Sequence, residues 1–250
     1  MPVGRSRILL GVALLLSACA ALPASPPSPE SPIRTIAIAS AIGPEIILGE
    51  TGAAASDDAS QHIAVPGWDL DGVAITAART ALARRFKVVA AASTPQDGPA
   101  LSSTAAILAA ARKGALTPTP ADLILVISSS NSAQNRQGHP TVDYGVGVSR
   151  WRGTPPFSRP PYVHAFLAVT VIDGKRFTLV TQASLKMKAR RQSVLGDEET
   201  LPFVPLEEFD WRDHWSDLTE RQHEQIRQLV ATLLKQAIPF TIEKLTLPES

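Results

Sequence analysis

The sequence is poor in cysteine, in aromatic residues and in excess charge, and each shortage excludes a class of protein. The chain has one cysteine among 250 residues, which excludes a disulfide framework and a cysteine-ligated zinc site. Its 24 Lys and Arg residues barely exceed its 23 Asp and Glu residues, whereas a nucleic-acid-binding protein usually carries a basic excess. Aromatic residues make up 5% and hydrophobic residues 44% of the chain. The core must therefore be built mainly from aliphatic side chains and alanine.

The N-terminus has the pattern of an export signal. Arg5 and Arg7 precede an unbroken run of apolar and small residues from Ile8 to Ala18, and these are the charged and hydrophobic parts of a secretory signal. The run is too short for a membrane-spanning helix, which takes roughly 20 apolar residues. We therefore expect residues 1–18 to be a signal peptide.

The residues that end this signal resemble the lipobox of bacterial lipoproteins, with Leu16, two small residues and then Cys19. The resemblance implies that Cys19 carries a diacylglycerol on its thiol, that the signal is cut before it, and that its new amino group is acylated. The alternative is an ordinary A-x-A cleavage site at residues 18–20, which would leave a soluble periplasmic protein. We favour the lipobox, because the only cysteine stands at the required position. Ala20, in place of Asp, implies the periplasmic face of the outer membrane by the same resemblance.

Residues 19–32 are expected to be a tether. The stretch 22–32 holds five prolines and three serines, so it buries little apolar area and favours extended polyproline II conformation. At ~3.1 Å per residue it could hold a domain up to ~45 Å from the lipid. A passive tether is a simpler interpretation than a proline-rich ligand motif.

Residues 33–250 are predicted to form a single α/β domain, with one mixed sheet of about five to seven strands and about three helices packed on it. Short β-branched runs at 34–39, 46–48, 86–89 and 123–127 are typical of strands. The last of these is uninterrupted, as expected of a strand covered on both faces. Apolar residues at helical spacing predict a helix after Asp69, and Ser102 or Ser103 can cap a second one that ends at Gly114.

The second half of the domain is predicted to be antiparallel. Residues 141–150, 162–172 and 177–187 read as strands, and Asp173-Gly174 between the last two indicates a type I′ hairpin. Thr219 and Gln222 form a capping box before a long amphipathic helix that Pro239 should end. This order of elements behind an export signal resembles the small α/β domains of bacterial envelope proteins of the TolB N-terminal, CsgG and LpoB types. The resemblance implies a fold but transfers no functional residue.

Few residues carry a pattern typical of chemistry, and we predict no catalytic residue, no cofactor and no metal site. Gly145-Val146-Gly147 resembles part of a dinucleotide loop, but it lies within a strand pattern, so close backbone packing is the better interpretation. The serines of the 128–131 loop follow the central strand, where α/β sheets often bind ligands, although serines also form turns. Asp210, Asp213 and His214 offer metal-ligand atoms but are crowded into five residues.

The segment 190–215 is the predicted partner-binding region, through Phe209, Trp211 and Trp215. A loop of this length is uncommon in a compact domain unless it is functional or disordered, and its aromatic residues lie among acidic ones. The alternative is that both tryptophans only fix the loop to the domain. The sequence thus predicts a non-catalytic binding or assembly factor with a protein partner in the envelope and no nucleic-acid partner. The alternative function is a carbohydrate-binding or hydrolytic enzyme that uses the 128–131 loop or the 210–215 cluster.

Overall fold

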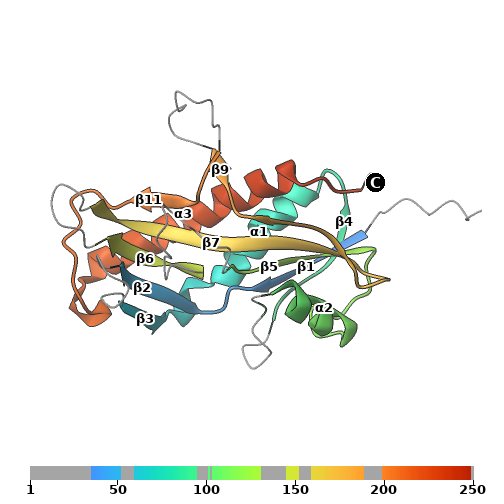
Figure 1. The fold of residues 1–250 in the computed structure, drawn as a ribbon, viewed down its shortest axis with the longest axis horizontal. Helices are drawn as coiled ribbons and strands as arrows, with labels where there is room; N and C mark the ends of the chain where they lie inside the picture. Colours follow the sequence, from blue (N-terminus) through green and yellow to red (C-terminus); the bar gives the residue numbers. More distant parts are fainter. Residues whose placement is uncertain are drawn as a thin grey trace, which may run out of the picture. The chain divides into compact units, whose positions relative to one another are not determined.

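The computed structural model describes residues 35–51, 59–94, 101, 103–130, 145–151, 159–188 and 199–248 (Figure 1). Pro32–Ser250 form one compact unit. The predicted signal peptide, the lipobox and the tether lie outside the described residues. Within the described part of the chain, no helix combines the length and the hydropathy needed to span a membrane.

The predicted mixed sheet with three helices is confirmed. Its path runs β3–β2–β6–β7–β5–β1–β4, and β8 and β11 also pair with β7. A separate pair is formed by β9 and β10. The strands are β1 (Thr35–Ala41), β2 (Glu45–Thr51), β3 (Ala59–Ala64), β4 (Lys87–Ser93), β5 (Leu123–Ser129), β6 (Gly145–Trp151), β7 (Arg159–Asp173), β8 (Leu179–Ser184), β9 (Met187–Lys188), β10 (Glu199–Thr200) and β11 (Phe203–Pro205).

The long strand β7 is shared by two half-sheets. Along one edge, its C-terminal half pairs with β5 and its N-terminal half with β6. The amide of Ser130 donates to the carbonyl of Phe166 at 3.2 Å, and Gly145 pairs with the same residue, so β5 and β6 form one interrupted line. Strands β1 and β2 form a second such line, because they pair with β5 and β6 respectively. The other edge of β7 carries β8 and β11.

A carboxylate closes the break between β1 and β2. Asp71, in the first turn of α1 (Leu70–Leu82), accepts from the Ser40 hydroxyl at 2.5 Å and from the Ile42 amide at 3.0 Å. It also accepts from the Gly43 amide at 3.3 Å. Gly43 has a φ of 78°, a conformation that glycine adopts without steric cost. The line of strands can therefore bend here without leaving buried amides unpaired.

The helices cover both faces of the sheet (Figure 1). Helices α1 and α3 (Glu220–Lys244) pack on one face, where Leu123, Leu125 and Ile127 point into the larger core. Helix α2 (Thr104–Arg112) covers the other face over Ile124 and Val126. All residues from Leu123 to Ser128 are buried, so the prediction of a central strand covered on both faces is confirmed. The predicted caps Asp69, Ser103 and Thr219–Gln222 are confirmed as well.

The predicted two-residue turn at Asp173-Gly174 is wrong. Strand β8 begins only at Leu179, and the Asp173 amide donates to the carbonyl of Thr178 at 2.9 Å. The Asp173 carboxylate instead accepts from the amides of Lys175 and Arg176 at 2.8 and 2.6 Å. The acid thus closes a longer connection through its side chain, a common use of aspartate in turns.

The predicted end of the last helix at Pro239 is also wrong, because α3 continues to Lys244. Proline removes one backbone hydrogen bond from a helix interior. Beyond it, Thr241 and Ile242 are buried against the core, and this burial offsets the lost bond.

Candidate functional site

The three aromatic residues predicted to bind a partner lie between β11 and α3, in residues 206–218, here called the aromatic segment. Phe209, Trp211 and Trp215 are all partly buried and pack against the larger core. Before it, β11 pairs antiparallel with β7, with Val204 opposite Val163, whereas sequence reasoning found no regular structure in this region. The aromatic segment is therefore attached to the sheet at its start and to the core along its length.

Arg150 of β6 links the sheet to the aromatic segment. Its guanidinium donates to Glu50 of β2 at 2.8 and 2.5 Å and to Asp213 at 2.9 Å, and it lies 4.8 Å from the ring centroid of Trp211. The Arg150 and Glu50 side chains are only 21% and 14% exposed. Ion pairs this sheltered are less screened than surface pairs, and a cation over an indole ring is attractive in addition. The sheltered pair with Glu50 therefore holds the guanidinium in place against Trp211, and Asp213 joins it from the solvent side, where its side chain is 69% exposed.

A second contact joins the end of the aromatic segment to two helices. The Trp215 ring stacks on His223 of α3, with centroids 4.3 Å apart and planes at 16°. His223 Nε2 also lies 3.1 Å from the Trp215 carbonyl oxygen. On the other side, Trp68, just before α1, lies 5.9 Å from Trp215. The His223 side chain is only 24% exposed, so it is half-buried beside the Trp215 ring.

Two glutamines hold the backbone of the aromatic segment. Gln61 of β3 donates to the Asp213 carbonyl at 2.8 Å, and Gln222 of α3 donates to the Asp210 carbonyl at 3.0 Å. Gln61 Nε2 also lies 3.5 Å from His214 Nδ1. Side chains of β3, β6 and α3, which are far apart in the sequence, thus converge on the aromatic segment.

The three potential metal ligands of the 210–215 cluster have separate partners. Asp210 pairs with Arg212, Asp213 pairs with Arg150, and His214 lies beside Gln61. Across the residues that the structure describes, no group of three His, Cys, Asp or Glu side chains could hold a metal ion. The three side chains therefore interact with other residues of the chain and do not converge on a common point.

The solvent side of this end is acidic. Glu207, Glu208, Asp210 and Asp217 are exposed around the half-buried rings. In the first turns of α3, hydrogen bonds from Arg227 and Gln228 lower the pKa of Glu224 to about 2, so this carboxylate stays charged throughout the physiological range. The site therefore presents an acidic rim around an aromatic base.

The 128–131 loop is not a loop at its start. Ser128 and Ser129 belong to β5, where they pair with Ala168 and Leu167 of β7, and Asn131 lies outside the described residues. The strand formed by the apolar run before them extends through both serines, which pair with β7 like the rest of β5. Ser128 and Ser129 are therefore strand residues, and the expectation of a loop at these two positions is wrong.

Close backbone packing at Gly145-Val146-Gly147 is confirmed. A Cβ atom on Gly147 would lie 2.2 Å from the carbonyl oxygen of Ile47 in β2, and Gly145 has a φ of 69°. Glycine is thus required at position 147, because any side chain there would collide with the backbone of β2.

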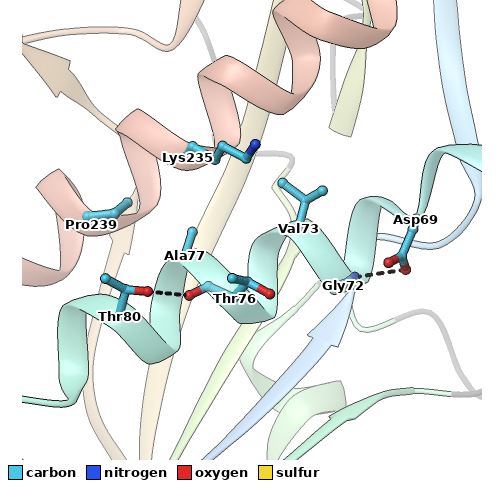
Figure 2. Close-up of a pocket in the computed structure, with 8 residues that line it drawn as sticks. All are labelled: Asp69, Gly72, Val73, Thr76, Ala77, Thr80, Lys235 and Pro239. Atoms are coloured by element: carbon cyan, nitrogen blue, oxygen red, sulfur yellow. Dashed lines mark hydrogen bonds between the residues drawn. The ribbon is translucent and has the colours of Figure 1, made fainter.

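Sequence reasoning missed a groove between α1 and α3 that encloses about 440 Å³. Figure 2 shows Val73 and Ala77 of α1 facing Lys235 and Pro239 of α3. The Thr80 hydroxyl in its wall donates to the Thr76 carbonyl at 2.9 Å, so it is engaged within the helix. No local pattern predicts this groove, because it depends on how two helices distant in the sequence cross.

Comparisons with known proteins give matches among solved structures alone. No family model matches the chain, and no curated protein matches it. Among solved structures, the chain is similar to the crystal structure of a protein from Xanthomonas campestris that carries the family model DUF330. The two share 10% identity over 86% of each chain, with a TM-score of 0.35.

Proposed function

We propose that this chain is a lipid-anchored protein of the bacterial envelope whose α/β domain binds a protein partner or helps to assemble a structure in the periplasm. The lipobox resemblance at Leu16–Cys19 is the observation that carries the proposal. It supports an anchor at the periplasmic face of the outer membrane, with residues 19–32 as the tether. Two or more acyl chains hold a protein on a membrane stably, whereas one chain binds only reversibly.

The aromatic segment supports the binding part of the proposal. It combines aromatic side chains that the domain holds in place with an exposed acidic rim. Tryptophan often contributes much of the affinity at protein interfaces, and a ring held in advance loses less entropy on binding. The alternative of a carbohydrate-binding or hydrolytic enzyme is less well supported, since the serines at 128 and 129 lie in β5 and the 210–215 side chains pair within the chain.

We expect the protein extracted from membranes to begin at Cys19 and to carry acyl groups. Its intact mass should match a 232-residue chain plus the mass of diacylglycerol and an amide-linked acyl chain. Cys19→Ser should abolish this mass increment and leave an uncleaved or mislocalised protein. Ser17→Ala, which keeps a small residue at that position, should change neither cleavage nor lipidation. An unmodified N-terminus at Ala21 would contradict the anchor.

We expect Trp211→Ala to abolish partner capture with little loss of stability. Trp211 is only partly buried where it packs on the core and contacts Arg150, so losing its side chain should lower the melting temperature by about 2–4 °C. Capture is measured in cells with a photo-crosslinking residue in place of Glu208, which is exposed in the acidic rim.

The matched control is Trp215→Ala. Trp215 stacks on His223 and lies beside Trp68, so its loss should lower the melting temperature by several degrees more than the loss of Trp211. If Trp211→Ala lowers the melting temperature as much and leaves the cross-linked product intact, the aromatic segment is only structural.

A further inference from the structure

The chain enters the domain at the end where several other segments terminate. Thr35 pairs with Lys87 at the start of β4, and its amide and hydroxyl donate to Asp122, just before β5, at 3.0 and 2.7 Å. Arg85, after α1, donates to the carbonyl of Leu247 at 3.3 Å. In Figure 1, the start of β1, the tip of the β7–β8 hairpin and the C-terminus lie toward the same side. We call this the tether end: Thr35 with residues 84–87, 112–123, 173–179 and 243–247.

The tether end is strongly basic. Eight of its residues are Lys or Arg and three are acids. Two of the acids already serve the fold, since Asp122 binds Thr35 and Lys175, and Asp173 caps the hairpin through the amides of Lys175 and Arg176. The eight basic residues, all exposed, are Arg84, Arg85, Lys87, Arg112, Lys113, Lys175, Arg176 and Lys244.

Apolar surface accompanies this charge. Leu179, at the start of β8, is 46% exposed although it is a large hydrophobic residue. Two residues earlier in the chain, Phe177 lines a hollow of about 330 Å³ together with Leu116, Pro118 and Ile124 among others. An exposed leucine and an apolar hollow among basic residues are the composition of surfaces that bind at the lipid–water interface.

The opposite end of α3 has the opposite charge. Residues 207–224 include seven acids and two arginines, and α3 spans about 37 Å from this region to Lys244 at a rise of ~1.5 Å per residue. A net charge of +1 therefore conceals two separated charged ends. An anionic surface would attract the tether end and repel the aromatic segment.

We propose that the tether end rests on the anionic phospholipid headgroups of the leaflet that holds the Cys19 lipids. This inference rests on the proposed lipid anchor. Each basic residue close to an anionic leaflet contributes roughly fivefold to association, and the attraction falls off within a Debye length of about 8–10 Å. The tether keeps the domain near the surface, so association is intramolecular and weak contacts suffice. The aromatic segment then faces the periplasm.

The test uses the full-length lipidated protein in vesicles that contain a nickel-chelating lipid as a membrane-bound quencher. The lipid blocks the Cys19 thiol, so a fluorophore can be placed on a single new cysteine, by Thr178→Cys at the tether end or by Gln225→Cys in α3. Both positions are exposed. In vesicles containing phosphatidylglycerol, quenching should be several-fold stronger at position 178 than at position 225. The difference should disappear when phosphatidylcholine replaces the phosphatidylglycerol at the same content of quencher lipid, or at high salt.

Charge variants test the same surface with matched net charge. Arg84→Gln, Lys87→Gln and Lys113→Gln together should weaken association of the tether end roughly 100-fold and equalise the quenching at the two positions. Lys188→Gln, Arg221→Gln and Lys235→Gln, which remove the same charge elsewhere, should leave the difference in place. Equal quenching at positions 178 and 225 of the protein without charge substitutions, in phosphatidylglycerol vesicles, would overturn the inference. The tether end would then be a candidate binding surface for an acidic protein. Failure of the lipid anchor is distinguishable, because the protein would then not remain with the vesicles and would lack the acyl mass at its N-terminus.

Discussion

Gly147→Ala should destabilise the domain by about 3 kcal/mol or more, at the upper end of the usual cost of overpacking. The new Cβ would lie 2.2 Å from the carbonyl oxygen of Ile47 and 3.0 Å from its backbone carbon and nitrogen. These are backbone atoms of a paired strand, so relief requires β2 and β6 to separate. Chemical denaturation followed by circular dichroism measures the change.

Gly67→Ala is the matched control. Nothing lies within 4 Å of a Cβ built at Gly67, so this substitution should change the free energy of unfolding by no more than about 0.5 kcal/mol. Similar losses from the two alanines would show that strands β2 and β6 are not packed as closely as the structure places them.

Leu233→Ala should cost about 2–5 kcal/mol, because deleting a buried leucine side chain loses transfer free energy and leaves a cavity. Leu233 lies in the middle of α3 with no exposed surface. In a domain whose total stability is of order 5–15 kcal/mol, this loss is large, and the denaturation midpoint should fall accordingly.

Gln228→Ala on the same helix gives the comparison. Gln228 is exposed and donates to Glu224 at 2.7 Å, so its removal should cost at most about 0.5 kcal/mol. Equal effects of the two substitutions would mean that the buried face of α3 is assigned wrongly.

The fold was predictable where one element carries its own signal. The apolar stripe and the capping box of α3, the uninterrupted β5 and the capped helices α1 and α2 depend on residues within a few positions of each other. Such patterns show whether one face or both faces of an element are buried, and they can be recognised without knowing which elements pack against it. The errors at Asp173-Gly174 and Pro239 arose where tertiary contacts decided between local alternatives. The Gly174 amide donates to the carbonyl of Asp122 at 2.8 Å, and Thr241 and Ile242 after Pro239 are buried against the core.

The candidate site was only partly predictable. Its aromatic residues stand out by composition, but Arg150 does not, because its partners Glu50 and Asp213 are 100 and 63 residues away. Strand β11 has three residues, too few for a periodicity to be recognised. Its place is determined by the free edge of β7, which exists only once the sheet has formed.

The break between β5 and β6 is a position where the domain should tolerate inserted residues. The chain leaves the line at Ser130, whose amide donates to the Phe166 carbonyl, and returns at Gly145, which lies opposite Phe166, so these two points meet at one position of the ladder. Lengthening a connection between two points that already lie together costs little, about 0.6 kcal/mol for each doubling of its length. An epitope or a small reporter domain could therefore be spliced between these points while the sheet on either side keeps its register.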